Sequence, residues 1–312
     1  MKRLLATFCF AALAAAAGTV AFPDAVTLDN GHIRVGVSPA AGRIVDFAPS
    51  GGGNLLWLNT GAEVRELRGS GRWVNYGGDR LWPELYNYWR SIRRVNIPDP
   101  QIDGGGWVLV ERAPLALTIR SRVSESLGCR ALRRIELVPG RPRLAVTNRL
   151  EQVEPTPFPV QLWPVTQIPP AEYYFFATAP ARVPYRISSD EQGGITVLPE
   201  QLVYRAPRGT TTKLTGNGEW LAARFGELLL VQASRHAPGA CYPEGGSQLL
   251  FTGPRYAELE FCGGLRHLKP GEAVENTVYW ELVRLPRDAG ETEAARVTRT
   301  TAHNLLQGKT QP

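Results

Sequence analysis

The sequence is poor in the residues that bind metals or build disulfide frameworks. Its 312 residues include four cysteines and four histidines, with no CxxC pair, no HExxH run and no close cluster of histidine and aspartate. Zinc sites need such ligands at short spacing, so these absences argue against a metal site, and no cofactor is expected. In an oxidising compartment Cys241 and Cys262 could pair, which would leave Cys129 buried and free.

Long apolar runs are equally rare, and the only long one covers residues 4–17. Lys2 and Arg3 precede it and small residues follow at positions 18–21, which is the pattern of a secretory signal peptide. A membrane span would need about 20 residues. Cys9 lies inside the run rather than at its exit, which argues against a lipid anchor. We therefore predict a signal peptide over residues 1–21 and a periplasmic or secreted protein without a membrane span after cleavage.

The excess of positive charge is small. Lysine and arginine number 35 against 29 acidic residues, and removing Lys2 and Arg3 reduces the net charge from +6 to +4. The arginines are scattered along the chain, as in residues 130–143, whereas nucleic-acid proteins gather them on one face. We expect no nucleic-acid partner.

Helical periodicity is also scarce, and what takes its place is alternation of apolar and polar residues. Residues 115–122 alternate strictly, with Leu115, Leu117 and Ile119 on one face, which is typical of a strand with one face in a core. The same reading gives strands over residues 32–37, 132–138, 143–148, 158–166, 220–225, 228–234, 257–261 and 277–285.

Glycine and proline breaks separate these strands, for example at residues 51–53 and 104–106. One stretch, residues 291–306, is typical of a helix, and its few apolar residues predict a surface position. A chain without helices between its strands does not form a parallel α/β fold. We predict an all-β fold, a large antiparallel sandwich over residues 22–287, followed by a short C-terminal helix and tail over residues 288–312.

One segment, residues 73–90, combines tryptophan with polar and charged residues around a Gly-Gly pair. Aromatic rings suit the C–H faces of a sugar, and carboxylate, amide and guanidinium groups suit its hydroxyls. The alternative is structural, since aromatics fill cores and an Asp-Arg pair often braces a turn. The predicted substrate-binding residues of this segment are Asn75, Tyr76, Asp79, Arg80, Trp82 and Glu84.

Two further stretches supply candidates. In residues 161–167, Trp163 could form a stacking surface or pack in the core, and Gln167 lies nearby. In residues 256–261, alternation places Tyr256, Glu258 and Glu260 on one face. Neighbouring carboxylates can raise one pKa and suit it to acid/base chemistry, although a solvated strand face explains them equally.

In the order of several short motifs, the sequence resembles members of the galactose mutarotase-like superfamily. The resemblance is in particular to an uncharacterised, exported bacterial branch, a domain of unknown function. The resemblance covers nearly all of the chain after residue 21. It implies a supersandwich of antiparallel sheets with a sugar-binding cleft. The stretches that carry it are residues 28–31, 37–44, 54–57, 75–82, 163–167 and 258–280.

Similarity to the aldose 1-epimerases of that superfamily implies roles for individual residues. Arg80 matches the arginine that holds the sugar, and Glu258 or Glu260 matches the glutamate base, with Glu260 preferred by position. The acid histidine has no match, because no histidine lies between Arg80 and Arg235. Asp79, Glu84 or a tyrosine could replace it, and the catalytic candidates are Glu260, Glu258 and Asp79.

The leading hypothesis is an exported carbohydrate-binding protein with a mono- or oligosaccharide as its partner. One alternative is a sugar-active enzyme that uses carboxylates, an aldose epimerase, lyase or hydrolase. The other is a structural or partner-binding envelope protein whose aromatic residues fill its own cleft.

Overall fold

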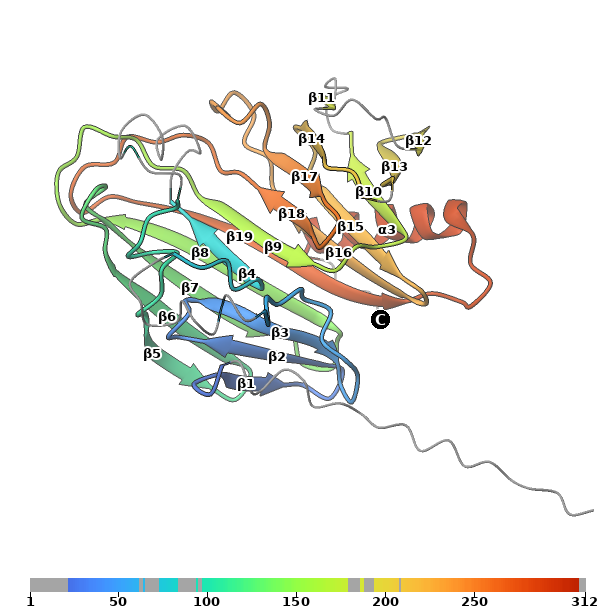
Figure 1. Cartoon of the computed structure of the whole chain (residues 1–312), viewed down its shortest axis with the longest axis horizontal. Coiled ribbons are helices and arrows are strands. Elements are labelled where there is room, and N and C mark those ends of the chain that lie inside the picture. Colours follow the sequence, from blue (N-terminus) through green and yellow to red (C-terminus); the bar gives the residue numbers. More distant parts are fainter. Residues whose placement is uncertain are drawn as a thin grey trace, which may run out of the picture.

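The computed structural model describes residues 22–61, 64, 73–83, 94, 97–178, 186–187, 194–207 and 209–308. The predicted signal peptide, residues 1–21, lies outside these residues. The described chain forms two antiparallel β-sheets that pack against each other, and one α-helix covers part of the second sheet (Figure 1). None of the described helices is long and apolar enough to cross a membrane.

The first sheet carries the site described below. Among the described residues it has nine strands, in the spatial order β1 (Val26–Asp29), β2 (Ile33–Ser38), β3 (Arg43–Pro49), β4 (Asp79–Trp82), β9 (Trp163–Ile168), β18 (Ala257–Phe261), β17 (Gln248–Thr252), β14 (Thr212–Gly216) and β11 (Arg186–Ile187). Three strands that are far apart in the sequence meet at its centre, where β9 lies between β4 and β18.

Within the described ranges the second sheet has ten strands, in the order β12 (Gly194–Leu198), β13 (Gln201–Arg205), β10 (Tyr173–Ala177), β15 (Trp220–Phe225), β16 (Leu228–Ser234), β19 (Ala273–Arg284), β8 (Arg143–Gln152), β7 (Cys129–Leu137), β6 (Ala116–Val123) and β5 (Val108–Ala113). Its long central strands follow from strict alternation: along β8 every second residue is buried. Residues buried in this way pack against the first sheet, as sandwich cores require.

The main core lies between the two sheets. Val35 and Phe47 of the first sheet and Ile135, Val146 and Trp280 of the second belong to one buried cluster. Phe47 meets the indole of Trp280 edge-on, with ring centroids 5.2 Å apart. The alternation that predicted the strands thus also assigns their faces, because the apolar set of each strand points into this layer.

Helix α3 (Glu291–Leu306) packs against the outer side of the ten-stranded sheet (Figure 1). Its buried face consists largely of small residues, including Ala294, Ala295 and Ala302. Small side chains let a helix approach a sheet closely, and the Gln201 amide donates a hydrogen bond to the Ala295 carbonyl at 2.7 Å. The helix has the predicted boundaries, but it is packed rather than superficial, because alanine and threonine can form an apolar stripe without large residues.

Candidate functional site

The candidate site lies on the outer face of the nine-stranded sheet, the face directed away from the second sheet. Alternation along the central strands turns every second side chain to this face. The register sets Glu258 beside Gln167, and it sets Val165 between Arg80 on one side and Glu260 on the other. Residues far apart in the sequence are therefore brought together by strand pairing.

Arg80 is the centre of a polar cluster on this face. Its Nη1 donates to the Asn75 Oδ1 at 2.7 Å, and its Nη2 donates to the Glu258 Oε1 at 3.2 Å. The same Glu258 oxygen accepts a hydrogen bond from the Gln167 Nε2 at 2.7 Å. The guanidinium also lies over the indole of Trp82, 4.5 Å from the ring centre. Four of the predicted site residues are thus in direct contact with Arg80 or with its partner.

A second cluster adjoins the first. The indole nitrogen of Trp163 donates to the Glu260 Oε2 at 2.8 Å, and the ammonium group of Lys213 lies 3.5 Å from the other Glu260 oxygen. Trp163 meets Trp82 edge-on, with ring centroids 5.1 Å apart. Both indoles are buried, at 1% and 7% exposure, so they are packed rather than open. Of the two roles suggested for Trp163, a stacking surface or core packing, its burial beneath Lys213 and Trp82 favours core packing.

The charges of the two clusters act on each other. Burial raises the pKa of Glu258, the neighbouring Glu260 raises it further, and Arg80, Gln167 and Lys213 oppose this, which leaves the pKa at about 7. For Lys213, burial lowers the pKa, but the two carboxylates outweigh burial and the net shift is upward, so the ammonium stays charged. A carboxyl with a pKa near 7 exists in both protonation states at physiological pH, which suits acid/base chemistry.

A tight turn before β4 aims Arg80 at the outer face. Gly77 and Gly78 both have positive φ, 83° and 75°. The turn is fixed by Arg43, a fully buried residue whose Nη1 donates to the Gly77 carbonyl at 3.0 Å. Burial lowers the pKa of Arg43 to about 10 against the effect of Asp103, so it remains a cation at neutral pH.

Replacing Gly78 with alanine should disturb this turn. An added Cβ would lie 2.3 Å from the Ile44 carbonyl oxygen, and the residue would also keep a left-handed conformation. We expect a loss of more than about 2 kcal/mol in the free energy of unfolding, since the conformation alone costs about 1–2 kcal/mol. Gly271→Ala is the matched control, with φ +89° and nothing within 4 Å. Equal losses in the two variants, measured by denaturant unfolding, would show that the contact with Ile44 costs nothing.

Asp79 does not lie on this face, which corrects its place among the predicted site residues. Adjacent residues of a strand point to opposite sides, so Asp79 enters the layer between the sheets. There its carboxylate pairs with Arg133 of β7, and its Oδ2 accepts from the Thr166 hydroxyl at 2.8 Å. Arg133 also donates to the Asp79 carbonyl and to Asn148, both at 2.9 Å. Asp79 thus joins the two sheets and cannot reach a ligand beside Arg80.

Among the other predicted residues, Tyr76 lies apart from the site. It packs with Phe22, Ala41 and Val45 in a separate apolar cluster. Glu84 lies outside the described residues.

Sequence reasoning missed several neighbours of the site. Lys213 lies between the buried residues Thr212 and Leu214, so alternation predicts that its side chain points to the opposite face. The sequence alone does not predict that β14 lies in the same sheet as β18. Trp57 and Phe251 reach the site through Tyr256, whose ring lies 4.5 Å from the first and 5.8 Å from the second. These contacts come from long-range pairing that a local pattern does not contain.

The cysteines and acidic residues offer no metal or disulfide site in the described part of the chain. Cys129, Cys241 and Cys262 are all free thiols, so the suggested pairing of Cys241 with Cys262 is not formed. Burial and Glu260 raise the pKa of the Cys262 thiol, which keeps it protonated. No group of three or more metal-ligating side chains occurs among the described residues.

No protein-family model matches this sequence, and no curated protein matches it. Solved structures do. A candidate aldose 1-epimerase from Escherichia coli K12 matches with a TM-score of 0.55 and 16% identity over 84% of this chain and 99% of the other. A galactose mutarotase-like protein from Lactobacillus casei matches with a TM-score of 0.54 and 11% identity over 83% and 100%. A candidate mutarotase from Salmonella typhimurium matches with a TM-score of 0.58 and 9% identity over 84% and 92%.

The chain has the galactose mutarotase-like fold, an antiparallel β-sandwich with a short C-terminal helix. This confirms the predicted fold class and the predicted likeness to that superfamily. At such low identity the comparison concerns the fold alone, and function has to be argued from the site.

Proposed function

We propose that this protein is an exported carbohydrate-binding protein whose ligand lies on the outer face of the nine-stranded sheet, over Arg80, Gln167 and Glu258. The observation that carries the proposal is the cluster of these three side chains at the centre of a mutarotase-like sheet. The basic residues and apolar run before residue 18 support export.

The polar atoms of this cluster fit the hydroxyls of a sugar. The Arg80 Nε and the Gln167 Oε1 are buried and have no hydrogen-bond partner among the described residues. Buried polar groups are nearly always hydrogen-bonded, so an unused donor and an unused acceptor on one face favour a polar ligand. Sugar hydroxyls both donate and accept, and the half-buried rings of Trp57 and Tyr256 offer an apolar edge beside them.

The test is a calorimetric and thermal-shift screen of the protein against mono- and oligosaccharides, with Arg80→Lys beside it. Lysine keeps the charge but loses the fork of donors, so affinity should fall about tenfold or more. Arg224→Lys is the matched control, because Arg224 is also buried but lies on β15 of the other sheet. If no saccharide binds, or if both variants bind as wild type does, the proposal is wrong.

A second candidate function, a sugar-active enzyme of the epimerase type, is favoured by one observation. Glu258 has a pKa of about 7 and lies against Arg80, so it can accept and return a proton near neutral pH. The experiment is to follow the interconversion of α- and β-glucose and galactose by NMR with and without protein. Rates equal to those in buffer would remove the epimerase candidate and leave the binding function standing.

A further inference from the structure

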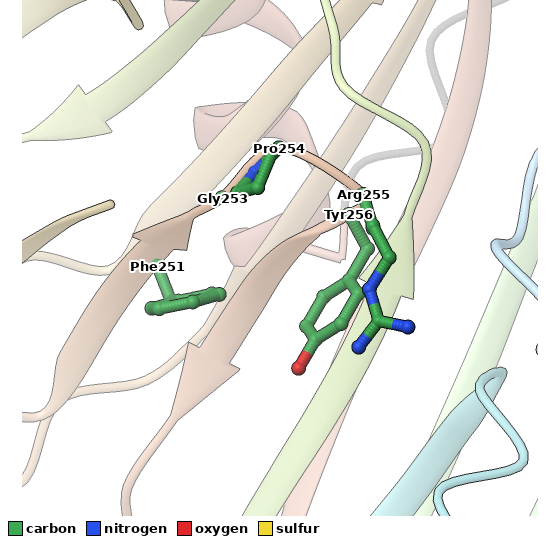
Figure 2. A pocket seen from close by; sticks show the side chains of 5 residues that line it. All are labelled: Phe251, Gly253, Pro254, Arg255 and Tyr256. Carbon is green, nitrogen blue, oxygen red and sulfur yellow. The ribbon is translucent and has the colours of Figure 1, made fainter. Parts of the chain in front are cut away.

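A hollow of about 180 Å³ lies at the hairpin between β17 and β18. Figure 2 shows Phe251 on one side of it and Tyr256 with Arg255 on the other, while Gly253 and Pro254 form the turn. A Cβ on Gly253 would lie 3.2 Å from the ring of Phe251, so a larger residue there would crowd the hollow. The turn sequence therefore keeps the space beside Phe251 open.

The residues that line the hollow adjoin the polar cluster around Arg80. Phe251 is the direct cross-strand partner of Glu258, and Tyr256 precedes Glu258 by two residues on the same face. On its other side Tyr256 contacts Trp57, whose backbone nitrogen donates to the Gln167 carbonyl at 2.9 Å. The ring of Tyr256 thus lies between the hollow and the residues around Arg80.

Arg255 is the charged residue among those that line the hollow. Arg255 is exposed and makes no hydrogen bond or ion pair with any described residue, whereas the carboxylate of Glu258 is already paired with Arg80. An unpaired guanidinium beside two aromatic rings is suited to a ring-shaped ligand that carries an anionic group, because its fork of donors matches a carboxylate.

We propose that this hollow is a second sugar subsite that takes an acidic unit of a saccharide chain, with the anionic group on Arg255 and the neighbouring unit over Arg80 and Glu258. The inference rests on the proposed carbohydrate-binding function and narrows its ligand class. The ligand is an oligosaccharide with a uronate or sulfated unit, rather than a neutral monosaccharide.

The experiment compares matched disaccharides by calorimetry. Cellobiose and maltose are measured against the corresponding disaccharides with a glucuronosyl unit, and a sulfated disaccharide distinguishes sulfate from carboxylate. Wild type should bind the acidic member of a pair about tenfold more tightly, which corresponds to about 1.4 kcal/mol, since a charge-assisted hydrogen bond is stronger than a neutral one. The preference should shrink as salt is raised.

Arg255→Gln should abolish the preference for the acidic disaccharide and leave neutral binding within about twofold, since only the charged partner of the anionic group is lost. Arg122→Gln is the control, an exposed arginine on β6 whose side chain pairs with no described residue. A preference that survives in Arg255→Gln, or equal binding of neutral and acidic disaccharides by wild type, overturns the subsite. Neutral binding that depends on Arg80 would then leave the proposed function intact, whereas no binding of any saccharide would overturn both.

Discussion

Replacing Asp79 with alanine is expected to lower the free energy of unfolding by about 3–5 kcal/mol, because it leaves the guanidinium of Arg133 buried without its carboxylate. Arg133 is 0% exposed and Asp79 2% exposed, so water cannot take the place of the lost partner. The Thr166 hydroxyl would lose its acceptor as well. Urea or guanidinium unfolding followed by tryptophan fluorescence measures the change.

A matched variant tests whether the loss of stability comes from the burial of the ion pair or from the ion pair alone. Asp46 pairs with Arg34 at 2.6 Å, but this pair is partly exposed, at 19% and 32% of the two side chains. Asp46→Ala should cost about 1 kcal/mol or less. Replacing both partners in the core, with Asp79→Leu and Arg133→Met, should recover much of the loss, since apolar pairs can replace a buried ion pair. Equal losses for Asp79→Ala and Asp46→Ala would contradict this account.

The second large effect concerns pH and Glu258. The folded-state pKa of about 7 lies above the ordinary value of 4.5. Below pH 4.5 the carboxyl is protonated in both folded and unfolded chains, and its contribution to stability is fully present. Between pH 4.5 and 7 the unfolded chain releases the proton first, so stability falls with rising pH, by about 3 kcal/mol in total. Above pH 7 both states are ionised and the fall ends.

Glu258→Gln removes this titration. The difference in unfolding free energy between wild type and Glu258→Gln should therefore decline from pH 4.5 to 7 and stay level above. The charged groups that act on Glu258, namely Glu260, Arg80 and Lys213, are unchanged in the variant. Glu154→Gln, at an exposed carboxyl elsewhere, is the matched control. A difference for Glu258→Gln that does not change with pH would mean that Glu258 titrates as an ordinary carboxyl.

Local pattern predicted the boundaries of several elements well. The helix α3 and the strands β15, β16 and β18 have the predicted boundaries. These three strands are buried at nearly every residue, so their ends follow from apolar runs that stop at turn residues such as Gly226, between β15 and β16. β9 begins at Trp163, later than predicted, because the prolines at 157 and 159 cannot donate to a ladder. The strands β10 and β13 are likewise buried at nearly every residue, and they were not predicted.

The candidate site was predicted only in part, because the sequence did not fix which way some side chains point. The composition around Gly77 and Gly78 indicated the segment that contributes Arg80 to the candidate site. It did not indicate which of the two adjacent residues, Asp79 or Arg80, faces outward. Alternation in β18 correctly grouped Glu258 with Glu260. Which strands lie beside β18 depends on pairing across about 90 residues, and only the structure supplies Gln167 and Lys213 as partners.

The two-sided use of the central strands limits how this protein can change during evolution. In β4 and β9 the residues that join the sheets, Asp79 and Thr166, alternate with the residues of the outer face, Arg80 and Gln167. Inserting or deleting one residue in either strand would exchange the two sets at once. Strand lengths here should be invariant among descendants of this sequence. New ligand preferences should arise by substitution at every second position, or by changes in turns such as residues 253–256.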